Sequence, residues 1–245
     1  MSEMKTNIEF RSDIGVKLVQ SVGSDASVIA AARVSVEGPE SVRHLGIDPG
    51  EKSGLIRYLM KQRHGSPFEH ASMTFLVDAP LFVFREWHRH RVGWSYSETS
   101  ARYRQMEPVF WLPPEDRPLR PAPGYRSARP QFVAGTEEDQ WKVRSRLKSV
   151  ALSAWLSYRE MVEAGFALEV ARAVLPVSLY TSMYATCNPR SLMHFLSLRT
   201  HDESARHVSY PQAEIEQAAR QMERAFAELF PLTHGAFCEF GRVAP

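Results

Sequence analysis

Cysteine is scarce in this chain. Only Cys187 and Cys238 occur among the 245 residues, far apart and without the paired spacing of a zinc site. Such a composition argues against a disulfide framework and against a structural metal site. We therefore interpret both cysteines as buried thiols without a chemical role.

Long apolar runs are also absent, because none approaches the roughly 18 residues that a membrane-spanning helix requires. The segment MSEMKTNIEFRSD at the start has no apolar stretch of the kind found in a signal peptide. A net charge of only +2 gives no overall basic field for holding nucleic acid. These features predict a cytoplasmic protein that binds neither membranes nor nucleic acid.

The first third of the chain carries alternating strand and helix patterns. Residues 15–22 alternate as a strand does, and Ser24 is a suitable cap for a helix through 28–34. Residues 51–62 carry an apolar helical face, and 71–78 alternate again. Asp78 and Pro80 then predict the start of a helix that runs to about Gly93.

Proline separates this part of the chain from a helical second half. Seven of the 16 prolines lie within residues 108–130, which predicts a surface loop without regular structure. Helices are expected over 140–164, in a short segment that reaches Leu175 and stops at Pro176, after the Asn188-Pro189 pair, and over 212–230. The order predicts an α+β fold with an antiparallel sheet, flanking helices and a single domain over 1–245. No Gly-rich dinucleotide-binding motif is present, so a bound flavin would not be held in a Rossmann manner.

The segment 85–104, REWHRHRVGWSYSETSARYR, is dense in arginine, aromatic and hydroxyl side chains. Arg85 and Arg89 stand four residues apart and would share one helix face, where they could clamp a phosphate. The alternative is a solvated basic face, but the interleaved aromatics favour a binding surface for the whole stretch. His88 and His90 point in different directions on a helix, which disfavours a metal site there.

The segment after Asn188 places an arginine among apolar positions. Leu192 and Leu196 define the inward face of this helix, and Arg199 follows them by seven and three residues. An unpaired charge on that face is costly, so Arg199 is expected to face a ligand. The alternative is a last-turn cation that reaches solvent. Glu169 and Arg172, three residues apart, are by themselves typical of a helical ion pair.

Five motifs in order resemble the flavin-dependent thymidylate synthases, the ThyX family, over nearly the whole chain. The central motif comprises Arg89-His90-Arg91, Ser95-Tyr96-Ser97-Glu98 and Ser100-Ala101-Arg102-Tyr103. Four supporting motifs flank it: AARVS at 31–35, HGSPFEHASMTF at 64–75, EVARAVLP at 169–176 and NPRSLMHFLSLR at 188–199. Each motif alone is a weak signal, whereas all five in register are specific.

The resemblance implies methylation of dUMP to dTMP, with FAD as cofactor and NADPH and 5,10-methylenetetrahydrofolate as co-substrates. It assigns to FAD the residues Ser35, Ser66, Glu69, Arg89, His90, Arg91, Glu98, Asn188, Arg190 and His194. It assigns to dUMP the residues Glu86, Arg89, Ser100, Ala101, Arg102, Arg172 and Arg199. Arg199 would be catalytic, beside the uracil, and no cysteine would act as nucleophile. The family's active site is built from several subunits of a homotetramer.

The chain departs from the family pattern at a few positions. One residue more than in the common signature separates Arg91 from Ser100, and Gly93 could absorb it. Glu86 stands where glutamine is common, Tyr210 stands where histidine is common, and residues 202–209 lengthen the loop after Arg199.

Two other functions fit parts of the same sequence. A nucleic-acid-binding module could use Trp87, Trp94, Tyr96 and Tyr103 to stack bases between arginines, although the small net charge disfavours it. A metal-dependent hydrolase could use the histidines. Those histidines are His64, His70, His88 and His90.

Overall fold

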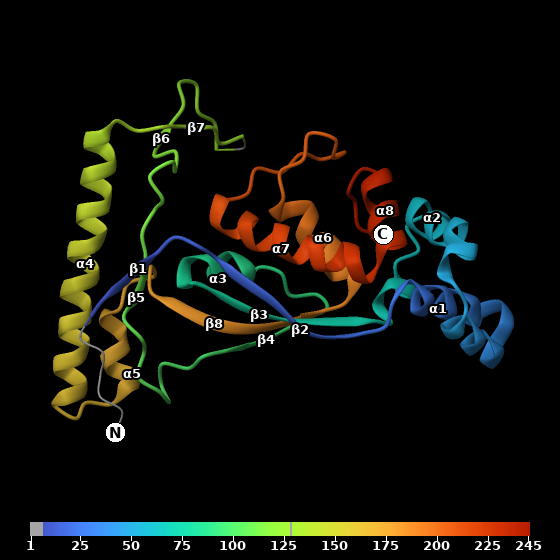
Figure 1. Cartoon of the computed structure of the whole chain (residues 1–245), viewed down its shortest axis with the longest axis horizontal. Coiled ribbons are helices and arrows are strands. Elements are labelled where there is room, and N and C mark those ends of the chain that lie inside the picture. Colours follow the sequence, from blue (N-terminus) through green and yellow to red (C-terminus); the bar gives the residue numbers. More distant parts are fainter. Residues whose placement is uncertain (1–6, 128) are drawn as a thin grey trace. The chain divides into compact units, whose positions relative to one another are not determined.

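The computed structural model describes residues 7–127 and 129–245, and it has an α+β fold (Figure 1). The chain forms two compact units. The first contains residues 7–13, 78–85 and 98–182, and the second contains residues 14–77, 86–97 and 183–245. The expectation of one domain stays a prediction.

A four-stranded antiparallel sheet lies mostly in the second unit. Its order is β2 (Gly15–Val22), β3 (Ser72–Pro80), β8 (Tyr180–Cys187) and β4 (Trp94–Glu98). Met73, Phe75 and Val77 of β3 are fully buried, as the alternating pattern predicts. The prediction of a helical second half was wrong at β8, an inner strand with the buried side chains Met183 and Ala185.

Helices pack on the sheet of the second unit, where α6 (Pro189–Arg199) and α7 (Ala213–Leu229) cover one face (Figure 1). The side chain of Ser24 caps α1 (Asp25–Glu37), and the side chain of Asn188 caps α6, as predicted. The unit also contains α2 (Ser53–Lys61) and the unpredicted α8 (Pro231–Glu239). In the first turn of α8, the Leu232 and Thr233 amides donate to the buried Asp25 carboxylate.

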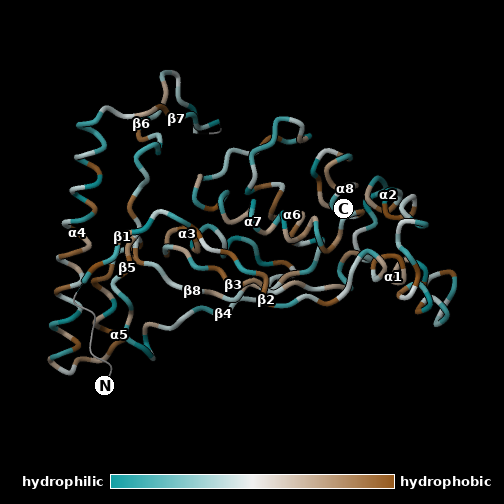
Figure 2. Tube along the Cα trace, in the orientation of Figure 1, coloured by the Kyte–Doolittle hydropathy of each residue, from teal (hydrophilic) through white to brown (hydrophobic). Residues whose placement is uncertain are grey.

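The first unit is built on α4 (Glu137–Glu163), along which hydrophobic and hydrophilic positions alternate (Figure 2). Thr136 caps α4, which begins three residues before the predicted start. Gly165 follows its end at φ +83°. Trp155 and Tyr158 of α4 form a core with residues from β5 and the loop before β8.

Short elements complete the first unit. Strand β1 (Glu9–Arg11) pairs in parallel with β5 (Val109–Trp111), and β6 (Arg120–Pro121) pairs with β7 (Phe132–Val133). The expectation of no regular structure over 108–130 was therefore wrong for β5 and β6. Helix α5 (Leu168–Ala171) follows α4.

Helix α3 (Leu81–Trp87) differs from the prediction at both ends. Strand β3 continues to Pro80, so neither Asp78 nor Pro80 opens the helix. The amides of Leu81 and Phe82 donate to the carbonyls of Leu179 and Val177, which replace a side-chain cap. The helix ends at Trp87, well before Gly93.

Candidate active site

Arg199 ends helix α6 and turns inward, with 19% of its side chain exposed. Its Nη1 lies 2.8 Å from Glu86 Oε2, and its Nη2 donates to the Glu86 carbonyl at 3.2 Å. Its Nε donates to His90 Nε2 at 3.1 Å. The inward orientation agrees with the helical spacing, because residues on the Leu192 and Leu196 side of α6 are buried.

His90 is held as a neutral acceptor beside Arg199. His90 is only 6% exposed. Burial lowers the pKa of its imidazole to about 4, and the charge of Arg199 and the nearby His194 contribute to the same shift. Because Arg199 donates to Nε2, the ring proton sits on Nδ1. The His90 ring meets the Phe195 ring edge-on at 4.8 Å and the His194 ring at 6.0 Å.

A second acidic residue, Glu214, acts on the Glu86 carboxylate that pairs with Arg199. Burial raises the pKa of Glu86, and the charge of Glu214 raises it further, against the opposing effect of Arg199. Glu214 is itself buried in the first turn of α7.

A cleft of about 420 Å³ lies in the second unit, beside the start of α6. Arg190 lines this cleft and links two other lining residues. Its Nη1 lies 2.6 Å from Glu69 Oε1, and its Nε donates to the Pro245 carbonyl at 2.6 Å. The cleft is lined by Arg63, Glu69, Val92, Gly93, Asn188, Arg190, Ser191, His194, Ala244 and Pro245.

Two glycines allow the close packing around this cleft. Gly93 has φ +68°, and a Cβ there would lie 2.1 Å from Ser191 Oγ and 2.9 Å from Asn188 Nδ2. A Cβ on Gly65 would lie 2.4 Å from Arg190 Nε. Glycine is thus required at both positions for contact with α6.

The cleft fits part of a dinucleotide cofactor. Its volume is within the range of small-molecule sites, about 300 to 1,000 Å³. Its lining includes two arginines, Arg63 and Arg190, together with the Asn188 amide and the His194 imidazole. These groups suit phosphate oxygens and the polar edge of an aromatic ring.

A second group of predicted site residues lies in the first unit. Glu98, Ala101 and Arg172 line a cavity of about 120 Å³. In the adjacent turn, Ser100 Oγ accepts from the Arg102 amide at 3.3 Å, and the Ser100 carbonyl accepts from the Tyr103 amide at 3.0 Å. A turn with side-chain hydroxyl and guanidinium groups is suited to an anion.

Glu169 pairs with Arg102 at 3.0 Å. The expected helical ion pair between Glu169 and Arg172 was therefore wrong, because Glu169 pairs with Arg102 instead. Both Glu169 and Arg102 are about half exposed, at 53% and 49%, so this surface pair is weak and free to open for a ligand.

Six predicted cofactor residues lie outside the cleft lining, including His90 beside Arg199 and Glu98 in the first unit. Ser35 is exposed on α1, where its hydroxyl donates to the Ala32 carbonyl. Ser66 opens an exposed turn, and Arg89 and Arg91 are exposed beyond the end of α3. Since α3 ends at Trp87, Arg85 and Arg89 do not share a helix face, and that part of the phosphate-clamp prediction was wrong.

The structure also identifies residues that the sequence reasoning missed. Arg63 lines the cleft from a left-handed conformation at φ +60°, and Ala244 and Pro245 contribute backbone from the other end of the sequence. Glu214 influences the pKa of Glu86 across a long sequence separation. No local pattern marks these positions, because their proximity arises only from packing.

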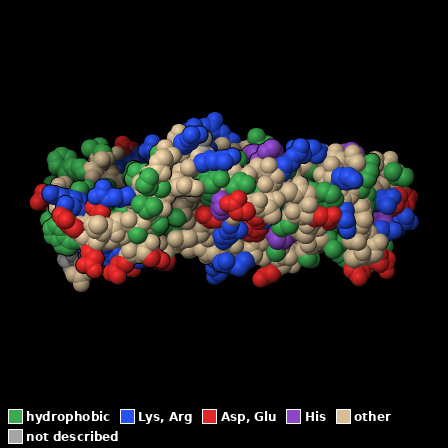
Figure 3. Space-filling model, turned by 90° about the horizontal axis from the view of Figure 1, so that it is seen from above, with side chains coloured by type: hydrophobic (Ala, Val, Ile, Leu, Met, Phe, Trp, Pro, Cys, Tyr) green, Lys and Arg blue, Asp and Glu red, His purple; other side chains and the backbone are tan. Residues whose placement is uncertain are grey.

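The alternative functions gain little from the described residues. Trp87 is fully buried, and Trp94 stacks on Tyr96 at 5.8 Å, so these rings are not arranged to receive bases. On the face drawn in Figure 3, basic and acidic side chains are interspersed. His88 Nε2 contacts the Met183 sulfur at 3.3 Å, and His90 is bonded by Arg199. None of the described helices is long and apolar enough to span a membrane.

Comparison with known proteins gives one consistent family. A family model described as thymidylate synthase complementing protein matches residues 17–232. The flavin-dependent thymidylate synthase of Streptomyces coelicolor is 56% identical over 238 residues, covering 97% of this chain and 96% of that protein. The enzyme of the same name from Tropheryma whipplei is 45% identical, covering 96% and 97%.

Solved structures extend the agreement to the fold. The UMP/dUMP methylase PolB from Streptomyces cacaoi, bound with 5-Br dUMP, is 50% identical with a TM-score of 0.88. That comparison covers 97% of this chain and all of PolB. PolB bound with 5-Br UMP gives a TM-score of 0.85 over 98% of this chain. By sequence, by motif order and by fold, this chain belongs to the family of flavin-dependent thymidylate synthases.

Proposed function

We propose that this protein methylates dUMP to dTMP, with 5,10-methylenetetrahydrofolate as carbon donor and FAD, reduced by NADPH, as hydride source. The observation that carries the proposal is Arg199, a half-buried guanidinium held between Glu86 and His90 at the end of a family motif. The names of the relatives and the 5-Br dUMP bound by PolB support the same chemistry.

FAD is proposed to bind the residues of the second unit around the cleft, together with Glu98. The set is Ser35, Ser66, Glu69, Arg89, His90, Arg91, Glu98, Asn188, Arg190 and His194. When bound, the reduced flavin would supply the hydride that converts the transferred one-carbon group into the methyl group of dTMP. Arg190, Arg89 and Arg91 would hold phosphate or ring oxygens by charge-assisted hydrogen bonds. Asn188 and Ser191 would keep the start of α6 rigid, since Asn188 Oδ1 accepts from the Ser191 amide at 2.8 Å.

The nucleotide is proposed to bind Glu86, Arg89, Ser100, Ala101, Arg102, Arg172 and Arg199. In the Ser100 to Arg102 turn, Arg102 would exchange its exposed partner Glu169 for the dUMP phosphate. That exchange costs little, because the existing pair is solvated.

Arg199 is proposed to stabilise negative charge that develops on the uracil when C5 becomes nucleophilic. A fixed cation in a partly buried site acts more strongly than one in water. His90 keeps the guanidinium in place through Nε, and Glu86 holds the other nitrogens until a ligand replaces it. No cysteine is required in this scheme. Cys187 is buried, and burial raises the pKa of its thiol well above the usual range, which suppresses the reactive thiolate.

A homotetramer is part of the proposal, because apolar side chains are exposed along α4. Trp141 is 69% exposed, and Leu152 and Leu156, which lie on the same side of the helix, are 51% and 46% exposed. Such a stripe is typical of a helix that another subunit covers. We further propose one functional domain over 1–245 and a cytoplasmic location.

Two measurements test the proposed function. The purified protein should be yellow with the absorption bands of an oxidised flavin, and extraction should release FAD. It should also form dTMP from dUMP, 5,10-methylenetetrahydrofolate and NADPH. A colourless protein that cannot be loaded with FAD would contradict the cofactor assignment, and a yellow protein without dTMP formation would contradict the reaction.

The matched variant for the cofactor is Arg91→Ala. We expect it to lower FAD occupancy, since a charge-assisted hydrogen bond contributes about 1.5 to 3 kcal/mol. Arg43→Ala is the control, because Arg43 is 61% exposed and pairs with Glu37 away from the cleft. Full FAD content in a folded Arg91→Ala variant would remove Arg91 from the site.

Methylation of UMP is a second candidate activity. It is favoured by one observation, the 5-Br UMP bound to PolB, a protein 50% identical to this chain. Parallel assays with dUMP and UMP at equal concentration decide between a deoxynucleotide-specific enzyme and one that accepts both sugars. We expect dUMP to be preferred, in line with the names of the relatives at higher identity.

A further inference from the structure

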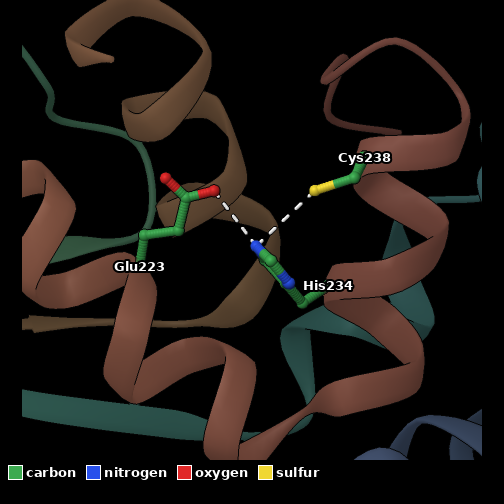
Figure 4. Close-up of side chains that lie close together, drawn as sticks. All are labelled: Glu223, His234 and Cys238. Atoms are coloured by element: carbon green, nitrogen blue, oxygen red, sulfur yellow. Dashed lines mark hydrogen bonds and ion pairs between the residues drawn. The ribbon is translucent and has the colours of Figure 1, made fainter. Parts of the chain in front are cut away.

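A cluster of chemically active side chains lies between α7 and α8, outside the candidate active site (Figure 4). His234 and Cys238 stand four residues apart on α8, and Glu223 faces them from α7. His234 Nε2 lies 3.0 Å from Glu223 Oε1 and 3.6 Å from Cys238 Sγ. Cys238 is exposed, which corrects its interpretation as a buried thiol.

Arg242 completes the cluster from the segment after α8. Only 5% of it is exposed, and its Nη1 lies 2.7 Å from Glu223 Oε1 and 3.6 Å from Cys238 Sγ. Its Nη2 donates to Thr200 Oγ1 at 2.9 Å, which fixes the guanidinium in this orientation. The sulfur therefore has two nitrogen neighbours at the same distance, one from His234 and one from Arg242.

Glu223, His234 and Cys238 could by residue type ligate a metal ion. The charges argue otherwise. Hydrogen bonds to Cys238 and Glu223 raise the pKa of His234 to about 9, so the imidazole is protonated at neutral pH. Hydrogen bonds from His234 and Arg242 lower the pKa of Glu223 to about 2 despite its burial. A metal ion would have to displace the proton of the His234 imidazolium and, in addition, the buried Arg242 guanidinium from the Glu223 carboxylate.

The arrangement instead suits an anion at the sulfur. An imidazolium and a guanidinium can only donate hydrogen bonds, so the sulfur must accept. The carboxylates nearby already have cationic partners. Glu223 is bound by His234 and Arg242, with Arg220 at 3.7 Å, and Asp202 lies 3.6 Å from Arg242. Next to Cys238, Glu239 pairs with Arg57 of α2 at 2.6 Å.

We propose that Cys238 is a nucleophilic thiol and a modification site for hydroperoxides and other small electrophiles, with His234 and Arg242 stabilising its thiolate. With a hydroperoxide, the sulfur attacks one oxygen, an S–O bond forms and the O–O bond breaks. The sulfur is oxidised by two electrons to a sulfenic acid, and the peroxide is reduced. The departing oxygen takes one proton, which the His234 imidazolium is placed to supply, and leaves as water or an alcohol.

The chain contains its own reference thiol. Cys187 ends β8 with 2% exposure, and burial raises the pKa of that thiol. Alkylation of the native protein with limiting iodoacetamide at pH 6.5, followed by peptide mass spectrometry, compares the two sites in one sample. An ordinary thiol is only about 1% ionised at that pH. Because the His234 and Arg242 nitrogens contact the sulfur of Cys238, we expect Cys238 to react about tenfold faster than free cysteine. Cys187 should stay unlabelled. Hydrogen peroxide followed by a sulfenic-acid probe should mark Cys238 alone.

His234→Gln is the decisive variant, since it keeps a polar side chain and removes the cation. It should slow alkylation of Cys238 about tenfold and move the pH profile of the rate upward, with unchanged far-ultraviolet circular dichroism. Cys238→Ser should abolish labelling. A Cys238 rate no greater than that of free cysteine, or an unchanged rate in His234→Gln, would overturn the proposal. Protection by stoichiometric Zn²⁺, with a Cd²⁺ thiolate absorption band, would show a metal site instead.

Discussion

The Arg199 guanidinium lies 2.8 Å from the Glu86 carboxylate, and this pair joins the end of α6 to the end of α3. Neither residue is fully buried, with 19% and 31% of the side chains exposed. A partly desolvated arginine with a replaceable acidic partner is suited to hold a ligand that becomes negatively charged. This relationship supports the proposed role of Arg199 beside the uracil.

Arg199→Ala should lose nearly all dTMP formation while FAD remains bound. Removal of one preorganised charge-stabilising group typically lowers kcat by about 100-fold or more. The absorption spectrum and the rate of dTMP formation are measured on the same sample. Arg199→Lys keeps the charge and should recover only part of the rate, because Lys cannot reach both Glu86 and His90 with a planar fork. Wild-type turnover in Arg199→Ala would exclude the role.

The His90 environment predicts a loss of stability in mild acid. Its folded pKa of about 4 lies below the ordinary value of 6.5, so the unfolded state binds more protons between these values. Stability from neutral His90 is thus complete above about pH 6.5 and falls as pH decreases toward 4, by about 3 kcal/mol in total. Urea unfolding from pH 7 to pH 4.5 measures the slope. His90→Gln should unfold with a smaller pH slope; an equal slope would contradict the assignment.

Gly93→Ala should destabilise the protein and reduce FAD content together. The substitution adds backbone strain at φ +68° and places a Cβ 2.1 Å from Ser191 Oγ. Gly165→Ala is the matched control, since Gly165 also has positive φ, at +83°, but nothing lies within 4 Å of its added Cβ. The control pays only the conformational cost of about 1 kcal/mol. The melting temperature should therefore be highest for the wild type, lower for Gly165→Ala and lowest for Gly93→Ala.

Arg102→Ala should weaken dUMP binding without loss of flavin. Loss of a charge-assisted phosphate contact corresponds to about 1.5 to 3 kcal/mol, or roughly 10- to 150-fold in Kd. Calorimetric titration with dUMP measures it. Arg104→Ala is the control, because Arg104 is exposed in the same segment and its ion pair with Glu107 is long at 3.9 Å. Equal dissociation constants for the two variants would show that the extra residue after Arg91 has displaced this turn.

The double variant Cys187→Ser, Cys238→Ser should keep most of its dUMP methylation activity. Cys187 is too buried to attack a substrate, and Cys238 belongs to the separate cluster of α7 and α8. Rates of dTMP formation in the folded, yellow double variant are compared with wild type. A folded variant with bound FAD but no activity would mean that a cysteine nucleophile is used after all.

Local sequence signals determined the elements with strong caps and periodicity. Ser24 and Asn188 start their helices as expected, and the Met73 to Val77 alternation places β3 correctly. The motif order, read along the chain, was enough to indicate the family. The inward position of Arg199 also followed from spacing alone, since α6 has a regular 3.6-residue period.

Long-range packing decided the rest. Strand β8 was not recognised because its inward positions include Thr181 and Ala185, which are weak hydrophobic signals, and its place between β3 and β4 is set by pairing with them. Arg199 acquired Glu86 and His90 as partners across more than 100 residues, and the His234 and Cys238 pair of α8 acquired Glu223 from α7. Sequence thus determined which residue types are available and which helix face each occupies. Tertiary structure alone determined which charges meet, because electrostatic and hydrogen-bonding partners are set by distance in space.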